Sequence, residues 1–178
     1  LKRRTQYAKQ FKTKNRAMLN KIEKKYAVSA NIILAIWAIE SDFGRAKLPF
    51  SSLKVLAYQI FVSNRSTYFY NDLLELINIL KKGSISFSET KSSSLGALGQ
   101  PQFMPSSFSR FAVDSDLDGK IDIWNNKEDV FGSMANYLSQ NGWNNKYIWG
   151  RAVNIDKIKD PMVYNKKINF FQNGKKLV

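Results

Sequence analysis

Hydrophobic residues recur at helical spacing along most of the chain, and this pattern predicts a mostly α-helical fold. Met18, Leu19, Ile22 and Tyr26 fall on one face of the segment 16–26, as in an amphipathic helix. Similar periodicity, together with candidate caps, predicts further helices over residues 30–40, 68–81, 106–113 and 128–140. Strand signals are few, and we expect little β structure.

Candidate strands are confined to residues 121–123 and to short pieces of the last 30 residues. The nearest feature to a linker is the polar segment 81–94. We therefore expect one domain over residues 1–178, with a helical lobe of about 1–90 and a second lobe of about 91–178. The charged N-terminus is not followed by an apolar stretch, so we expect either a cytosolic protein or one whose targeting segment has been removed.

The composition excludes several classes of catalyst. The chain contains no His and no Cys, which excludes serine–histidine and cysteine–histidine catalysis, disulfides and most transition-metal sites. Acid–base chemistry must therefore use carboxylates, Lys or Tyr. Aromatic residues make up 13% of the chain, enough to fill a core and still line a ligand groove.

The charge is strongly basic and unevenly distributed. Lys and Arg number 28 against 14 acidic residues, a net charge of +14, whereas six of those acids lie between Asp114 and Asp129. This distribution suggests an anionic polymer as partner and a local cation site, although a merely solvated basic surface is equally compatible. Charge alone allows nucleic acid, a membrane surface or an acidic glycan. No nucleic-acid-binding motif is recognisable, so we expect no nucleic-acid partner.

Glu40 follows the most apolar run in the chain, eight residues from Ile32 to Ile39. We expect its carboxylate to be partly desolvated, with a raised pKa suited to a general acid near neutral pH. Asp42 lies two residues away and should point to another helix face, which disfavours a two-carboxylate glycosidase site. The alternative is that Glu40 is an ordinary surface residue at a helix end.

Residues 93–107 predict an irregular loop, because two Gly and two Pro interrupt any helix. Gln100, Gln102 and Ser93 supply neutral donors and acceptors, and Phe103 supplies an apolar face. The loop contains no Lys or Arg, so this mixture suits sugar hydroxyls and acetamido groups better than phosphates. A surface loop of this composition needs no function, however.

Residues 114–125, DSDLDGKIDIWN, have the spacing of an EF-hand calcium loop, with Gly119 at the sharp turn. Position 12 carries Asn125 in place of the usual Glu, and a residue three positions further on could close a longer loop. The ligands expected for a structural, non-catalytic Ca²⁺ are the side chains of Asp114, Asp116, Asp118 and Glu128 and the backbone carbonyl of Lys120. The alternative is a plain Asp/Gly turn.

Three strings, AIESDFGR, SLGALGQPQFMPSSFSRFAVDSDLDGKIDIWN and EDVFGSMANYLSQNGW, resemble the membrane-bound lytic murein transglycosylase B family, bacterial enzymes that cut the glycan strands of peptidoglycan. They cover most of residues 29–143. The resemblance implies a lysozyme-like catalytic domain with an EF-hand-like calcium loop, and Glu40 as catalytic acid/base. The groove residues it implies are Ser93, Gln102, Tyr137 and Arg65.

The resemblance also implies a reaction and a location. Such an enzyme cleaves the β-1,4 bond between N-acetylmuramic acid and N-acetylglucosamine and leaves 1,6-anhydromuramyl ends. It would act on peptidoglycan as a monomer in the periplasm, with anchoring to the outer membrane as a lipoprotein an option. The alternatives are a lysozyme-like muramidase that uses the same Glu40, and an inactive peptidoglycan-binding module. The second is suggested because the chain stops at Val178, before a groove-completing segment that we expect in relatives.

Overall fold

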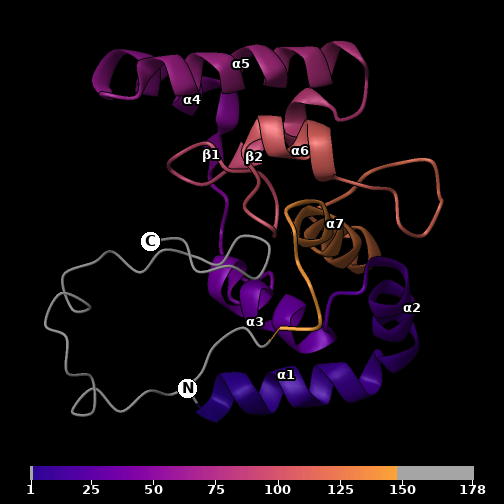
Figure 1. Cartoon of the computed structure of the whole chain (residues 1–178). Coiled ribbons are helices and arrows are strands. Elements are labelled where there is room, and N and C mark those ends of the chain that lie inside the picture. Colours follow the sequence, from indigo (N-terminus) through magenta and orange to yellow (C-terminus); the bar gives the residue numbers. More distant parts are fainter. Residues whose placement is uncertain (1, 148–178) are drawn as a thin grey trace, which may run out of the picture.

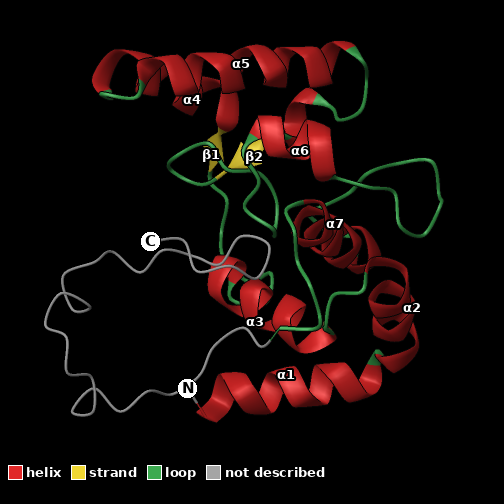
Figure 2. Cartoon of the chain, in the orientation of Figure 1, coloured by secondary structure: helices red, strands yellow, loops and turns green. Residues whose placement is uncertain are grey.

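Helices dominate the computed structural model, which describes residues 2–147 (Figure 2). The α-helices are α1 (Lys2–Lys14), α2 (Arg16–Tyr26), α3 (Ala30–Ser41), α4 (Ser52–Val62), α5 (Ser66–Lys81), α6 (Pro105–Phe111) and α7 (Lys127–Gln140). A 3₁₀ turn spans Phe87–Glu89, and β1 (Phe50–Ser51) pairs antiparallel with β2 (Lys91–Ser92). The predicted mostly-α fold is confirmed. No helix in the described range is long and apolar enough to cross a membrane.

The five predicted helices are present as α2, α3, α5, α6 and α7. Helix α6 starts at Pro105 with Met104 as its N-cap, because proline suits the first helical position. The predicted strand over residues 121–123 is wrong. Its Asp122 carboxylate accepts the backbone N–H groups of Trp124 and Asn125, each at 2.8 Å, and this local bonding turns the chain. The strands expected at the C-terminus fall outside the described residues.

The first hydrophobic core lies between α2, α3 and α7, with α1 packed along it. Trp37 of α3 and Phe131 of α7 are fully buried at its centre, with their ring centroids 4.9 Å apart. Phe11 of α1 closes the cluster, 4.9 Å from the ring of Trp37. We call this group of four helices the α3 lobe. In Figure 1, α1, α2 and α3 form the lower part of the molecule, and α7 lies above them near the middle.

The second core lies between α4, α5, α6 and the loops that follow the small sheet, and we call this group the α5 lobe. Its buried residues include Leu56, Leu76, Leu98 and Ile123. Helices α4 and α5 form the top of the molecule in Figure 1, with α6 below them. The two cores do not follow the predicted division near residue 90, because α7 returns from the second half of the chain to the first core.

Candidate active site and metal loop

Glu40 lies in the last turn of α3, a helix that Ser29 caps by accepting the N–H of Asn31. The buried stripe of this helix is Ala30, Ile33, Leu34, Trp37 and Ser41. Glu40 lies off that stripe and is exposed, and its carboxylate makes no hydrogen bond or ion pair within residues 2–147. We expected partial desolvation of its carboxylate, but the apolar run continues onto the exposed side of the helix, where Ile39 is 76% exposed. Glu40 is open to a ligand.

Asp42 caps the C-terminus of α3 in the left-handed conformation, with φ of 47°. Its two carboxylate oxygens pair with Arg4 at 3.0 Å and with Arg45 at 3.1 Å. The hydrogen bond from Arg45 is the main reason that the pKa of Asp42 is held below its usual range. Asp42 is therefore a neutralised carboxylate, whereas Glu40 remains unpaired.

The loop after β2 holds Ser93 and Gln102 in one compact turn. The Ser93 hydroxyl accepts the N–H of Ala97 at 3.2 Å, and the backbones of Leu98 and Phe103 exchange hydrogen bonds at 2.7 and 3.0 Å. The Gln102 amide donates to the loop's own backbone at 2.8 Å, which leaves its carbonyl oxygen without a partner in the described range. Both side chains are partly exposed. The loop therefore presents hydroxyl and amide groups from a fixed backbone.

Tyr137 of α7 lies beside this loop. Its ring centroid is 5.6 Å from that of Phe103 and 5.0 Å from that of Phe111, the latter edge-on. Phe103 follows Gln102 directly, so the structure brings two of the predicted groove residues, Gln102 and Tyr137, to one place. The phenol of Tyr137 remains about one-third exposed, at 37%.

Arg65 precedes α5 and stacks over the ring of Tyr68 at 4.3 Å, a cation–π contact. Burial raises the pKa of Tyr68, and the charges of Asp72 and Tyr137 act in the same direction. Tyr68 thus holds the guanidinium of Arg65, although the sequence analysis did not select it. No hydrogen bond or ion pair within residues 2–147 joins Glu40 to these groups.

Gln100 connects the two lobes beneath this region. Its buried side-chain oxygen accepts Trp37 Nε1 at 2.7 Å and Lys127 Nζ at 3.2 Å, and its Nε2 donates to the carbonyl of Trp124. Burial lowers the pKa of Lys127. One amide therefore links the helix that carries Glu40 to the end of residues 114–125, which we call the acidic loop, and to the start of α7. The sequence showed Gln100 only as one of several amides in the loop.

We expect Gln100→Leu to destabilise the protein. The substitution leaves Trp37 Nε1 and the Trp124 carbonyl without partners, and each unsatisfied buried group costs about 1–3 kcal/mol. Urea unfolding measures the change. The matched control is Gln140→Leu on the exposed end of α7, for which we expect a change within about 0.5 kcal/mol. Equal stability of the two variants would contradict the role of Gln100.

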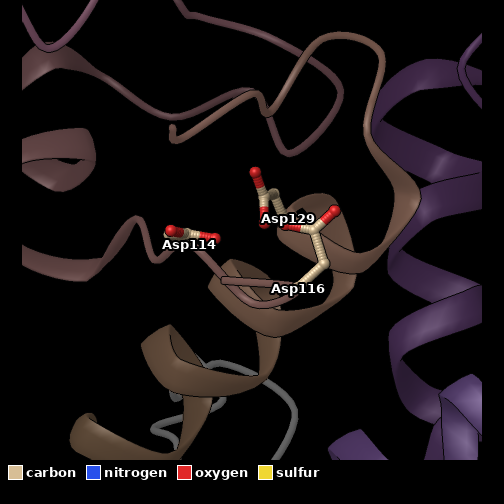
Figure 3. A group of neighbouring side chains, drawn as sticks. All are labelled: Asp114, Asp116 and Asp129. Carbon is tan, nitrogen blue, oxygen red and sulfur yellow. The ribbon is translucent and has the colours of Figure 1, made fainter. Parts of the chain in front are cut away.

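Three carboxylates gather where the acidic loop meets the first turn of α7. Oxygens of Asp114, Asp116 and Asp129 all lie within 4.8 Å of one another (Figure 3). Asp114 also accepts the N–H groups of Leu117 at 2.7 Å and Gly119 at 2.9 Å. These bonds give the loop its tight turn, in which Gly119 has a φ of +91°.

The predicted ligands outside this cluster have other contacts. The Asp118 carboxylate accepts the N–H of Lys120 at 2.8 Å, and Glu128 pairs with Lys21 of α2 at 3.3 Å. The carbonyl of Lys120 accepts no hydrogen bond within the described range. The structure therefore brings Asp114 and Asp116 together as predicted, but places Asp129 beside them where we expected Glu128.

Asp129, missed by the sequence analysis, ties the loop to α7. It is buried, and its carboxylate accepts the N–H groups of Ser115 at 2.7 Å and Asp122 at 2.8 Å. Burial raises the pKa of Asp129. Asn126 caps α7 and donates to Asp116 at 2.7 Å, which holds the pKa of Asp116 below its usual value. This set of oxygen donors is the kind that Ca²⁺ takes in proteins.

The sequence matches the family model described as "Transglycosylase SLT domain" over residues 1–173. The chain belongs to this family. It is 35% identical over 126 residues to membrane-bound lytic murein transglycosylase B of Escherichia coli (strain K12), a match that covers 70% of this chain and 35% of the relative. The resemblance stated from the motifs is thereby confirmed.

Solved structures of lytic transglycosylases share this fold. SltB3 from Pseudomonas aeruginosa, in complex with NAG-anhNAM-pentapeptide, superposes with a TM-score of 0.74 at 34% identity, over 79% of this chain and 37% of SltB3. Slt35 from Escherichia coli, in complex with calcium, gives 0.74 at 32% identity, over 81% of this chain and 46% of Slt35. This SLT-domain chain therefore spans less than half the length of these relatives.

Proposed function

We propose that this SLT-domain chain is a peptidoglycan lytic transglycosylase in which Glu40 is the acid and then the base. It cleaves the β-1,4 bond between N-acetylmuramic acid and N-acetylglucosamine and forms 1,6-anhydromuramyl ends. The observation that carries the proposal is the contrast between two neighbouring carboxylates. Glu40 is exposed and unpaired, whereas Asp42 is held by Arg4 and Arg45, so this end of α3 offers one carboxylate for chemistry.

One carboxylate is sufficient for this reaction. Glu40 gives its proton to the glycosidic oxygen, the C1–O bond breaks, and the electron pair leaves with the N-acetylglucosamine oxygen. The substrate's own acetamido group stabilises the positive charge at C1. The ionised Glu40 then takes the proton from the C6 hydroxyl of the muramyl sugar, whose oxygen bonds to C1. No water is consumed, and no second carboxylate is needed as nucleophile or base.

The predicted groove residues have separate roles in this proposal. The Gln102 carbonyl oxygen and the Ser93 hydroxyl hold the acetamido group, since both lie partly exposed on the fixed loop. The ring of Tyr137 provides an apolar face for a sugar. Arg65, exposed and stacked on Tyr68, offers a positioned guanidinium for an anionic group of the substrate.

Mass spectrometry of the fragments released from purified peptidoglycan tests this function. We expect muropeptides that end in 1,6-anhydromuramic acid, which weigh one water less than hydrolysis products. Reducing ends would identify a muramidase that uses the same Glu40. Glycan binding without any released fragment would identify an inactive binding module.

We propose in addition that a structural Ca²⁺ binds the acidic loop. The clustering of Asp114, Asp116 and Asp129 supports it, as does the solved complex of Slt35 with calcium. Asp118 and the carbonyl of Lys120 complete the predicted set. The cation would neutralise these carboxylates and hold the start of α7, and it would have no part in bond cleavage. Because Glu128 pairs with Lys21, we expect Asp129 to matter more than Glu128.

The proposed place of action is the cell wall, reached from the periplasm, with the protein working as a monomer on glycan strands. One relative is named a membrane-bound enzyme, and anchoring of this protein as an outer-membrane lipoprotein belongs to the same proposal. The net charge of +14 would attract the protein to an anionic wall, and salt would weaken that attraction.

A further inference from the structure

A basic pocket lies beside the end of α3 that carries Glu40. It has a volume of about 360 Å³ and opens between the first turns of α1 and the turn that follows α3. Its lining includes Arg3, Arg4, Gln6, Tyr7, Gln10 and Arg45. Figure 1 shows the N-terminal end of α1 on the same side of the molecule as the C-terminal end of α3. Asp42, two residues after Glu40, forms part of the pocket wall.

The pocket carries an excess of positive charge. Three guanidinium groups, those of Arg3, Arg4 and Arg45, line it together with one carboxylate, that of Asp42, so the excess is 3 − 1 = 2 charges. The oxygens of Asp42 are already engaged by Arg4 and Arg45. Arg3 makes no ion pair with any residue from 2 to 147. A bound anion would therefore meet an uncompensated guanidinium.

The guanidinium of Arg45 is also held in position by aromatic rings. It stacks over Tyr7 at 5.3 Å and over Phe43 at 5.6 Å, and Tyr7 and Phe43 themselves pack at 4.6 Å. A guanidinium fixed in this way loses little freedom when it binds. The pocket is thus partly organised before a ligand arrives.

The chemistry of the lining favours a peptide carboxylate. Guanidinium groups match the planar carboxylate through paired hydrogen bonds. The side-chain amides of Gln6 and Gln10 can donate to and accept from peptide groups, and Tyr7 offers an apolar face. A site for phosphate alone would need neither amides nor a ring. Asp42 of the lining follows Glu40 by two residues, so the pocket adjoins the end of the helix that carries Glu40.

We infer that this pocket binds a carboxylate of the stem peptide attached to the muramyl sugar of the strand bound at Glu40. The inference rests on the proposed function, because that function makes a peptide-bearing glycan the substrate. Arg3 would then be a specificity residue. It would favour strands that carry their peptides over strands that have lost them, without touching the bond that is cleaved.

The test compares peptide-bearing glycan strands with strands stripped of peptides by an amidase. We expect Arg3→Gln to lower kcat/KM on peptide-bearing strands by about 10-fold or more, since a hydrogen bond to a charged group is lost. The same variant should leave the rate on stripped strands unchanged. The matched control is Arg16→Gln at the exposed start of α2, which removes the same charge outside the pocket and should leave both rates unchanged.

Direct binding separates this inference from the proposed function. We expect the wild type to bind a disaccharide pentapeptide more tightly than the bare disaccharide, and Arg3→Gln to remove about 10-fold of affinity for the former only. Equal binding of the two ligands by the wild type would overturn the inference, whether or not strands are cleaved. A loss of affinity in Arg16→Gln equal to that in Arg3→Gln would also overturn the inference. Displacement of the peptide ligand by equimolar inorganic phosphate would do the same. Peptide-dependent binding without anhydro products would contradict the proposed function alone.

Discussion

Glu40→Gln is expected to abolish the release of anhydromuramyl fragments while the protein stays folded and still binds glycan. Gln keeps the shape and the hydrogen-bonding capacity of Glu, but it has no carboxylic proton to give. General acid–base catalysis contributes about 10²–10⁴-fold to a rate, and Glu40 serves both proton transfers, so the loss should reach this range. Because Glu40 is exposed and unpaired, the free energy of unfolding should change by less than about 0.5 kcal/mol.

The neighbouring carboxylate supplies the control for this prediction. Asp42→Asn removes a charge at the same end of α3 but leaves Glu40 in place, and we expect a much smaller loss of cleavage rate. The loss should come from the ion pairs with Arg4 and Arg45. If Glu40→Gln cleaved glycan at a rate within about threefold of wild type, Glu40 could not be the catalytic acid, because loss of that acid should slow cleavage by about 10²–10⁴-fold. A comparable loss in both variants would indicate a two-carboxylate hydrolase instead.

The helices that could be predicted from the sequence are those with a continuous apolar stripe. Helices α1 and α4 were not predicted, because their apolar residues do not form a continuous stripe along one face. Helix α1 reads KRRTQYAKQFKTK, and only a few residues such as Phe11 reach the core, so most of its length is polar. Helix α4 is apolar, but it buries only Ser52 and Leu56 and leaves Phe61 87% exposed. It packs against α5, the next helix along the chain, and because α4 is apolar nearly all round, its own sequence does not show which side that contact covers.

The same limit applies to the candidate site. The motif identified Glu40, but an apolar run does not establish burial, because a helix can expose an apolar residue such as Ile39. Gln100 gains its importance from Trp37, which lies 63 residues earlier. In the acidic loop, the first carboxylates follow a fixed spacing and could be predicted. The last one depends on where α7 begins, and its cap at Asn126 turns Asp129 rather than Glu128 toward the loop.

Calcium is expected to raise the melting temperature, and a chelator to lower it. A ligand that binds only the folded state adds about 2.7 kcal/mol at a hundredfold excess over Kd, which corresponds to about 5–10 °C for a chain of this size. Mg²⁺ should substitute poorly, because it requires a smaller octahedral shell. Differential scanning calorimetry with calcium, magnesium or chelator measures these shifts. A melting temperature indifferent to all three would show that residues 114–125 form only a turn.

Paired variants at the start of α7 distinguish the two candidate closing residues. Asp129→Asn replaces one of the two oxygens that accept backbone N–H groups, so it should lower the melting temperature even without calcium, and it should also lose the calcium-dependent rise. Glu128→Gln removes the same charge one residue earlier, but it breaks only the exposed pair with Lys21, which contributes about 0–1 kcal/mol. That variant should keep most of the rise. The opposite result, with the rise lost in Glu128→Gln and kept in Asp129→Asn, would restore the closing ligand that the sequence predicted. It would also mean that Glu128 leaves Lys21 when the cation binds.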